Sequence, residues 1–230
     1  MNVPAGQVII GVDVGTTAAK VAVFGIGSPW RHVAVREYPL LEPKPGFQVQ
    51  DPETIAAATL SALADAVAAA RGAEVLALSV STAMHGLIGL DADMAPVTPL
   101  VTWADARSAD EAAGLRASGA SLELHAITGT PVHSMTPLTK LMWFARHDAP
   151  TAARVRWWVG LKDYVLWRLT GTLATELSSA SGTALLDRRS RSWSERATQL
   201  AGISTDQLPD ILPTTAILGL SRLVGKMSGS

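Results

Sequence analysis

The sequence of 230 residues contains no cysteine. This absence excludes a disulfide scaffold, a thiolate zinc site, an iron–sulfur cluster and a cysteine nucleophile, and it agrees with a cytoplasmic protein in a reducing environment. An excess of charge of one sign is also missing, because 19 basic residues are offset by 20 acidic ones and the net charge is −1. We therefore expect no nucleic-acid partner.

Long apolar runs are missing as well. Residues 1–7 have neither the basic start nor the apolar stretch of a signal peptide, and no uncharged run reaches the ~20 apolar residues that span a bilayer. The longest candidate, residues 75–90, is interrupted by polar residues and glycines, so we expect no membrane partner. Hydrophobic residues nevertheless make up 48% of the chain, which is enough to fill one large core.

The apolar pattern predicts strands in the first half of the chain and helices in the second. Residues 8–14, 20–24 and 33–38 predict an antiparallel meander. A helix follows, with Asp51 as N-cap and Pro52 at its first position, and it is expected to end near Gly72. Further predicted elements are a buried strand at 75–81, strands at 87–90 and 100–103, and helices at 138–146, 161–169 and 193–201. This order favours a mixed sheet flanked by helices.

A short polar segment, Asp13-Val14-Gly15-Thr16-Thr17, follows directly on the first predicted strand. Gly15 lets backbone amides approach a phosphate, the threonine hydroxyls can donate to its oxygens, and the Asp13 carboxylate can hold a hydrated Mg2+. The alternative is a hairpin turn whose polar side chains only satisfy nearby backbone groups. Lys20 lies just beyond, either where a cation meets a nucleotide phosphate or as a solvated strand lysine.

Several segments together resemble one known family. Residues 10–17 are similar to the first phosphate loop of the actin-like, ribonuclease-H-like ATPase superfamily, in its sugar-kinase branch. Residues 135–147, Met-Thr-Pro-Leu-Thr-Lys-Leu-Met-Trp-Phe-Ala-Arg-His, resemble the N-terminal signature of the FGGY carbohydrate kinases. Further agreement comes from Met84-His85-Gly86, from residues 102–107 (Thr-Trp-Ala-Asp-Ala-Arg), and from Thr175-Glu176 with residues 180–183 (Ala-Ser-Gly-Thr). The resemblance implies an α/β fold, the ribonuclease-H-like mixed sheet with flanking helices, as the first domain only of such a kinase.

The resemblance also implies where ligands bind. Met84 and His85 line the sugar pocket, Trp103 adds an aromatic wall, and Asp105 accepts a sugar hydroxyl. Such a set suits a polyol, which offers apolar C–H faces and many hydroxyl groups. Taken alone, His85 is better interpreted as a satisfied histidine at a strand end, and Trp103 as a core residue; the order and company of the motifs favour the ligand-binding roles.

The cofactors implied by the resemblance are ATP and Mg2+. Asp13, Gly15, Thr16, Thr17 and Lys20 are then the phosphate-binding residues, and Asp13 holds the Mg2+ through water. In the long signature, by contrast, we expect packing roles. Lys140 is predicted to cover apolar surface with its stem and to keep its amine in water.

The resemblance breaks off near the C-terminus. Transfer of a phosphoryl group to a sugar hydroxyl requires a carboxylate that takes the hydroxyl proton. In the family this base is an aspartate just beyond a stretch similar to residues 211–215, but no Asp or Glu follows Asp210 in this sequence. We therefore predict an N-terminal domain at 1–215 and an aberrant or truncated tail at 216–230, with the second kinase domain absent. The chain alone is expected to be inactive and to self-associate through the face that a second domain covers.

The predicted function is that of the sugar-binding domain of an ATP-dependent carbohydrate kinase. Met84-His85 departs from the Arg-Glu pair of glycerol kinases and, with residues 102–105, is most similar to gluconate kinases and next to xylulose kinases. Gluconate is therefore the favoured substrate, and xylulose or another polyol is the alternative. A hypothesis of another class is a non-catalytic binding module or an inactive gene fragment.

Overall fold

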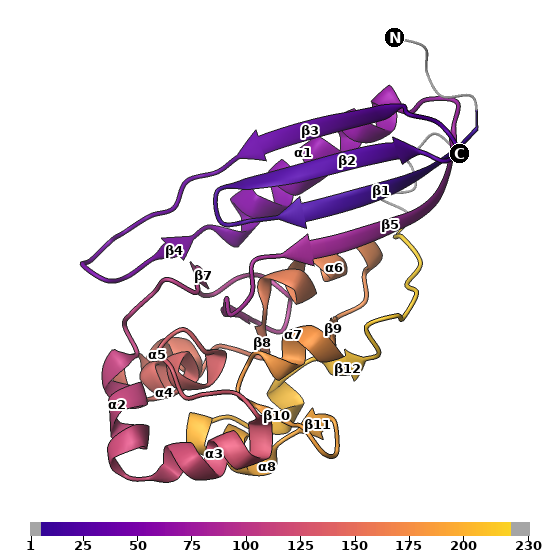
Figure 1. Ribbon diagram of the computed structural model, residues 1–230. Coiled ribbons are helices and arrows are strands. Elements are labelled where there is room, and N and C mark those ends of the chain that lie inside the picture. Colours follow the sequence, from indigo (N-terminus) through magenta and orange to yellow (C-terminus); the bar gives the residue numbers. More distant parts are fainter. Residues whose placement is uncertain (1–5, 222–230) are drawn as a thin grey trace.

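The computed structural model describes residues 6–221, and its centre is a mixed four-stranded sheet (Figure 1). The strand order is β3-β2-β1-β5. β1 (Gln7–Val14), β2 (Ala18–Gly25) and β3 (Arg31–Glu37) form the predicted antiparallel meander, and β5 (Glu74–Thr82) pairs in parallel with β1. The predicted mixed sheet is therefore confirmed.

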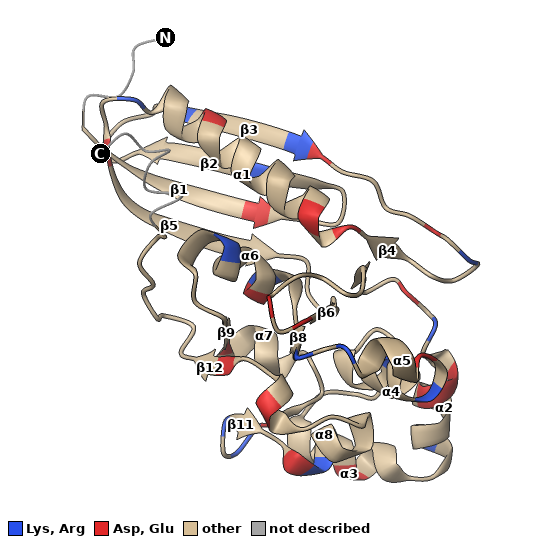
Figure 2. Ribbon diagram, turned by 180° about the vertical axis from the view of Figure 1, so that it is seen from behind, with Lys and Arg blue, Asp and Glu red and all other residues tan. Residues whose placement is uncertain are grey.

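Helix α1 (Pro52–Ala69) covers one face of this sheet (Figure 2). The Asp51 side chain accepts hydrogen bonds from the amides of Glu53 and Thr54, which satisfies donors that the first helical turn leaves free. Apolar residues of the strands alternate between the two faces, and those facing α1 are buried. The helix ends at Ala69, slightly before the predicted Gly72.

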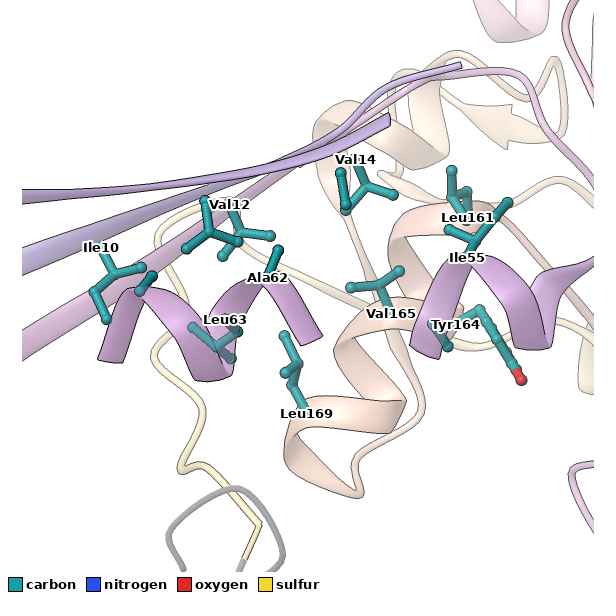
Figure 3. Packing of buried hydrophobic residues seen from close by; sticks show 14 of the residues in the cluster. Ile10, Val12, Val14, Ile55, Ala62, Leu63, Leu161, Tyr164, Val165 and Leu169 are labelled. Atoms are coloured by element: carbon teal, nitrogen blue, oxygen red, sulfur yellow. The ribbon is translucent and has the colours of Figure 1, made fainter. Parts of the chain in front are cut away.

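The main core lies between the sheet, α1 and α6 (Leu161–Thr170) (Figure 3). Ile10, Val12 and Val14 of β1 face residues such as Ile55 and Leu63 of α1. From α6, the core receives Leu161, Tyr164, Val165 and Leu169. This packing fixes the end of β1, where the polar segment of residues 13–17 begins.

The remaining elements form a second hydrophobic cluster around residues such as Leu124, Phe144 and Trp158. Four short two-stranded sheets connect them: β4 (Val49–Gln50) with β7 (Leu100–Val101), β6 (Ile88–Leu90) with β8 (Trp157–Val159), β9 (Ala174–Glu176) with β12 (Asp210–Leu212), and β10 (Leu186–Asp187) with β11 (Ser192–Trp193). The helices are α2 (Ala109–Ala117), α3 (Ala120–Thr128), α4 (Pro137–His147), α5 (Ala149–Ala152), α7 (Leu177–Ser181) and α8 (Glu195–Ala201), with a 3-10 turn at Thr205–Gln207. Within residues 6–221, no helix has the length and apolar character needed to cross a bilayer.

Two predicted elements differ from the structure. The predicted buried strand at 75–81 is β5, an edge strand of the four-stranded sheet, and its Val75 and Leu76 are exposed. An apolar run does not distinguish an edge strand from a central one, because that depends on the neighbouring strands. The predicted helix at 193–201 begins only at Glu195, since Trp193 pairs with Leu186 and Ser194 is the N-cap.

The sheet face opposite α1, here called the outer face, carries apolar side chains. Ile9 and Phe24 are register partners on it, and Val33 and Val35 follow on β3. These four residues are 43–53% exposed. Asp13 and Lys20 are register partners on the same face, nearer the turn between β1 and β2. The outer face therefore combines an apolar patch with charged side chains, of which Asp13 and Lys20 lie nearest the turn between β1 and β2.

Candidate functional site

The turn Gly15–Thr17 connects β1 to β2 and is held by three hydrogen bonds to its carbonyl oxygens. The Tyr38 hydroxyl donates to Gly15 O at 2.6 Å, and the Tyr38 amide donates to Thr17 O at 3.1 Å. Gln50 Nε2 donates to Thr16 O at 2.8 Å. With its carbonyls held by protein donors, the turn is fixed in place, as an anion-binding loop has to be.

Asp13 and Lys20 lie beside this turn and are both exposed. The pKa of Tyr38 is raised, mainly by burial and also by the negative charge of Asp13. Among the described residues, no group of three or more His, Asp or Glu side chains is arranged to hold a metal directly. Asp13 is the carboxylate at this turn that could hold a hydrated Mg2+, since this ion usually keeps several waters and takes one or two carboxylates.

Trp103 lies against the turn. Its indole Nε1 donates to Thr16 Oγ1 at 3.1 Å, although the two residues are far apart in the sequence, and 49% of the side chain remains exposed. Between them opens a cleft of about 210 Å3, which we call the Trp103 cleft. Its lining includes Thr16, Gln50, Met84, Thr102, Trp103 and Leu161. Trp103 is therefore not sealed in the core, and the structure brings it together with Met84 and Thr16.

Met84 and His85 follow β5 and separate the Trp103 cleft from a larger neighbouring cavity of about 550 Å3. His85 has a φ of +62°, a left-handed conformation that is uncommon for residues other than glycine. Its ring Nδ1 lies 2.9 Å from Gly182 O, and its ring lines the larger cavity. Met84 lines both the Trp103 cleft and the larger cavity, whereas His85 lines the larger cavity and is absent from the lining of the Trp103 cleft.

Asp105 differs from its predicted role. It is 1% exposed, and its two oxygens accept from Arg107 Nε and Nη2, both at 2.9 Å. The Gln48 amide donates to Asp105 Oδ2 at 2.8 Å, and the Arg107 guanidinium lies over the rings of Phe47 and Trp143. Because these partners occupy both oxygens and Asp105 does not line the Trp103 cleft, the structure corrects the expectation of a sugar-hydroxyl acceptor. Its carboxylate supports the Trp103 loop.

Lys140 also differs from expectation, since its amine lies in the interior and not in water. The side chain is fully buried on α4. Its Nζ donates to His85 O at 2.6 Å, Thr102 O at 2.7 Å and Val101 O at 3.4 Å. The sequence signature contained this residue, but nothing in its spacing indicates which backbone segments the amine meets.

Sequence reasoning missed Asp163, which lines the larger cavity. One of its oxygens accepts from the Gly160 amide at 2.7 Å, while Oδ1 is buried without a hydrogen-bond partner among the described residues. Burial raises the pKa of this carboxyl to about 6. Nearby, Lys162 pairs with Glu176 at 3.1 Å. The only available signal was an acidic residue three positions after a helix-capping glycine.

The family can now be stated. The model of the FGGY family of carbohydrate kinases, N-terminal domain, matches residues 8–228. The chain belongs to this family. The predicted resemblance and the predicted fold class are confirmed, while the predicted boundary at residue 215 and the ligand-binding roles of the site residues other than Asp105 stay predictions.

Two relatives and two solved structures illustrate the similarity. The chain is 32% identical to the gluconokinase of Bacillus subtilis (strain 168) over 91% of its length and 30% identical to the xylulose kinase of the same strain over 92%. A gluconate kinase structure and a xylulose kinase structure, both from Lactobacillus acidophilus, each superimpose with a TM-score of 0.91 and 32% identity over 97% of this chain. The chain spans 41–42% of the two curated relatives and 45–46% of the two solved chains.

The two aspartates predicted to bind ligands should differ in their effect on stability. Asp105→Ala leaves the buried Arg107 without its partner, which typically costs about 3–5 kcal/mol of the free energy of unfolding. Asp13→Ala removes an exposed carboxylate and is expected to change stability by no more than about 0.5 kcal/mol. Urea unfolding of the two variants and the wild-type chain measures both values. Equal effects of the two substitutions on the free energy of unfolding would contradict the conclusion that Asp105 is a buried ion-pair partner and Asp13 an exposed carboxylate.

Proposed function

We propose that this chain is the sugar-binding part of an ATP-dependent carbohydrate kinase, with gluconate as the favoured substrate. The observation that carries the proposal is the hydrogen bond between Trp103 Nε1 and Thr16 Oγ1. It joins the aromatic wall of the Trp103 cleft to a turn that we propose to bind phosphate. A kinase requires this proximity, because the acceptor hydroxyl and the transferred phosphoryl group have to meet in line.

The Trp103 cleft has the chemistry that a sugar requires. The indole of Trp103 and the thioether of Met84 offer apolar surface to C–H faces, and both side chains are more than 40% exposed. Gln50 and Thr16 add polar groups to the same lining. A mostly apolar cleft with a few fixed polar groups is the usual form of a small-molecule site.

Asp13, Gly15, Thr16, Thr17 and Lys20 form the proposed nucleotide side of the site. The Gly15 amide already donates to Ala18 O at 3.0 Å, so the donors proposed for phosphate oxygens are the Thr16 and Thr17 hydroxyls, and the ammonium group of Lys20 lies on the same sheet face as Asp13. Asp13 would hold Mg2+ through its water shell. Bound ATP supplies the phosphoryl group, and these side chains contribute position and charge.

Sugar binding is the first test of the proposal. Gluconate added to the wild-type chain should change the fluorescence of Trp103, which is read as the difference between the wild-type chain and Trp103→Phe. Xylulose tests the alternative substrate, and glycerol serves as a small polyol control. Binding of xylulose but not gluconate would reverse the preference between the two. Binding of none of the three would favour a non-catalytic module or an inactive gene fragment.

The isolated chain is expected to lack kinase turnover. Loss of a general base alone typically lowers the rate by about 100- to 10,000-fold, and loss of nucleotide positioning lowers it further. A coupled assay of ADP release with gluconate, xylulose, ribulose or glycerol should therefore give the background rate. Turnover that follows the purified protein through a gel-filtration peak and falls in Asp13→Ala would show that the chain is active alone.

The apolar patch of the outer face is proposed to be an interface, and in the isolated chain it should cause self-association. Val33→Lys places a charge at a position that is 53% exposed, and it is expected to reduce the associated fraction in sedimentation velocity at fixed concentration. Leu122→Lys on α3 is the matched control, because Leu122 is 77% exposed and lies outside the patch. A wild-type chain that stays monomeric at high concentration would contradict the proposal.

A further inference from the structure

We infer that Lys140 is a positioning residue, whose buried amine holds the two loops of the Trp103 cleft in their relative places. The loop after β5 carries Met84 and His85, and the loop after β7 carries Thr102 and Trp103. The effect on sugar binding rests on the proposed function. The effect on the loops does not.

The geometry of the amine supports this role. Lys140 Nζ donates to His85 O at 2.6 Å and to Thr102 O at 2.7 Å, with a longer bond to Val101 O at 3.4 Å. One of these carbonyls adjoins Met84, and another adjoins Trp103. A protonated amine has three donors and no acceptor, so three carbonyls match it in number. α4 therefore ties together two loops that line the same cleft.

The backbone at His85 adds a second argument. Its left-handed φ of +62° is unfavourable for a residue with a side chain, and such conformations persist where the surroundings determine them. Two contacts fix this residue in the structure: its ring against Gly182 O and its carbonyl against Lys140 Nζ. Removing the amine removes one of them, and the backbone at Met84 and His85 is then free to relax to an ordinary conformation.

The charges near the amine predict a response to pH. The charged or titratable groups nearest to it are Asp105 and Arg107 on the loop after β7 and His85 on the loop after β5. Burial, with the repulsion of Arg107, lowers the pKa of Lys140 to about 7, against the attraction of Asp105. A protonated amine donates three hydrogen bonds and a neutral one donates two, so the hold on the loops should weaken as pH rises through about 7.

Global stability should change in the opposite direction. The pKa of Lys140 is lower in the folded chain than its ordinary 10.5, so between about pH 7 and 10.5 the unfolded chain binds more protons at this group than the folded one. The contribution of this lysine to the free energy of unfolding therefore rises with pH in that window. As pH rises, the loops should therefore become more mobile while the free energy of unfolding increases. General loosening of the protein would instead lower the free energy of unfolding.

NMR of the indole Nε1–H of Trp103 tests the inference on the 230-residue chain. In the wild-type chain this resonance should shift with pH, with a midpoint near 7 that matches the titration of the Lys140 side-chain signal. In Lys140→Met the resonance should be displaced or broadened, and its titration near 7 should be lost. Thr139→Val is the matched control, because Thr139 is equally buried on α4, but its hydroxyl bonds to Thr136 O, His133 O and Ser108 Oγ at the N-cap of α2, and not to the backbone of Met84, His85, Thr102 or Trp103.

Gluconate titration is the second readout. Lys140→Met should raise the Kd about tenfold or more at pH 6, as expected for lost hydrogen bonds from a charged group, while Thr139→Val should leave it near the wild-type value.

A Trp103 resonance with the same position and pH response in wild type and Lys140→Met would overturn the inference, as would an equal disturbance in Thr139→Val. Should Lys140→Met fail to fold, the wild-type titration decides alone, and a Trp103 signal independent of pH between 6 and 8 overturns the inference. Absence of gluconate and xylulose binding by a wild-type chain whose Trp103 titrates as expected would contradict the proposed function and leave the positioning role of Lys140 supported.

Discussion

A charged amine removed from water must be surrounded by acceptors, and this requirement organises the region around the Trp103 cleft. Helix α4 carries the amine of Lys140 into the interior, and the acceptors come from the loops after β5 and β7. The ion pair of Asp105 and Arg107 lies near this amine and holds the loop after β7, to which both residues belong. Segments from distant parts of the sequence meet here because their carbonyls satisfy one buried cation.

The turn proposed to bind phosphate obtains its rigidity from buried side chains beside the sheet. The turn Gly15–Thr17 has no regular structure of its own, yet Tyr38 at the end of β3 and Gln50 in β4 hold its carbonyls. Both side chains are buried, with exposures of 6% and 2%, so their rotamers are set by packing. Trp103 then connects the turn to the loops held by Lys140. Core, turn and cleft wall thus form one continuous network of contacts.

Local signals in the sequence were enough to predict the meander, the capped start of α1 and the family, because alternation, capping and motif spacing are local properties. They also placed Trp103 and Met84 among the candidate site residues, which the structure brings together at one cleft. Asp105 and Lys140 were misjudged for a common reason. Whether a charged side chain faces ligand, water or a buried partner depends on how distant segments pack around it. The His85 and Thr102 carbonyls receive the Lys140 amine, and the Gln48 amide helps to enclose the carboxylate of Asp105, which pairs with its sequence neighbour Arg107. No pattern around the residue itself carries that information.

The position of Asp13 and Lys20 on the outer face has a dielectric consequence. They share this face with the apolar patch of Ile9, Phe24, Val33 and Val35. A surface that covers the patch also excludes water from the edge where the two charges lie, and Coulomb interactions strengthen several-fold when high-dielectric solvent is replaced by protein. In the proposed kinase, docking on the outer face and attraction of a metal–phosphate group at the turn would therefore be coupled, because the contact that buries the apolar side chains would also strengthen the field of Asp13 and Lys20.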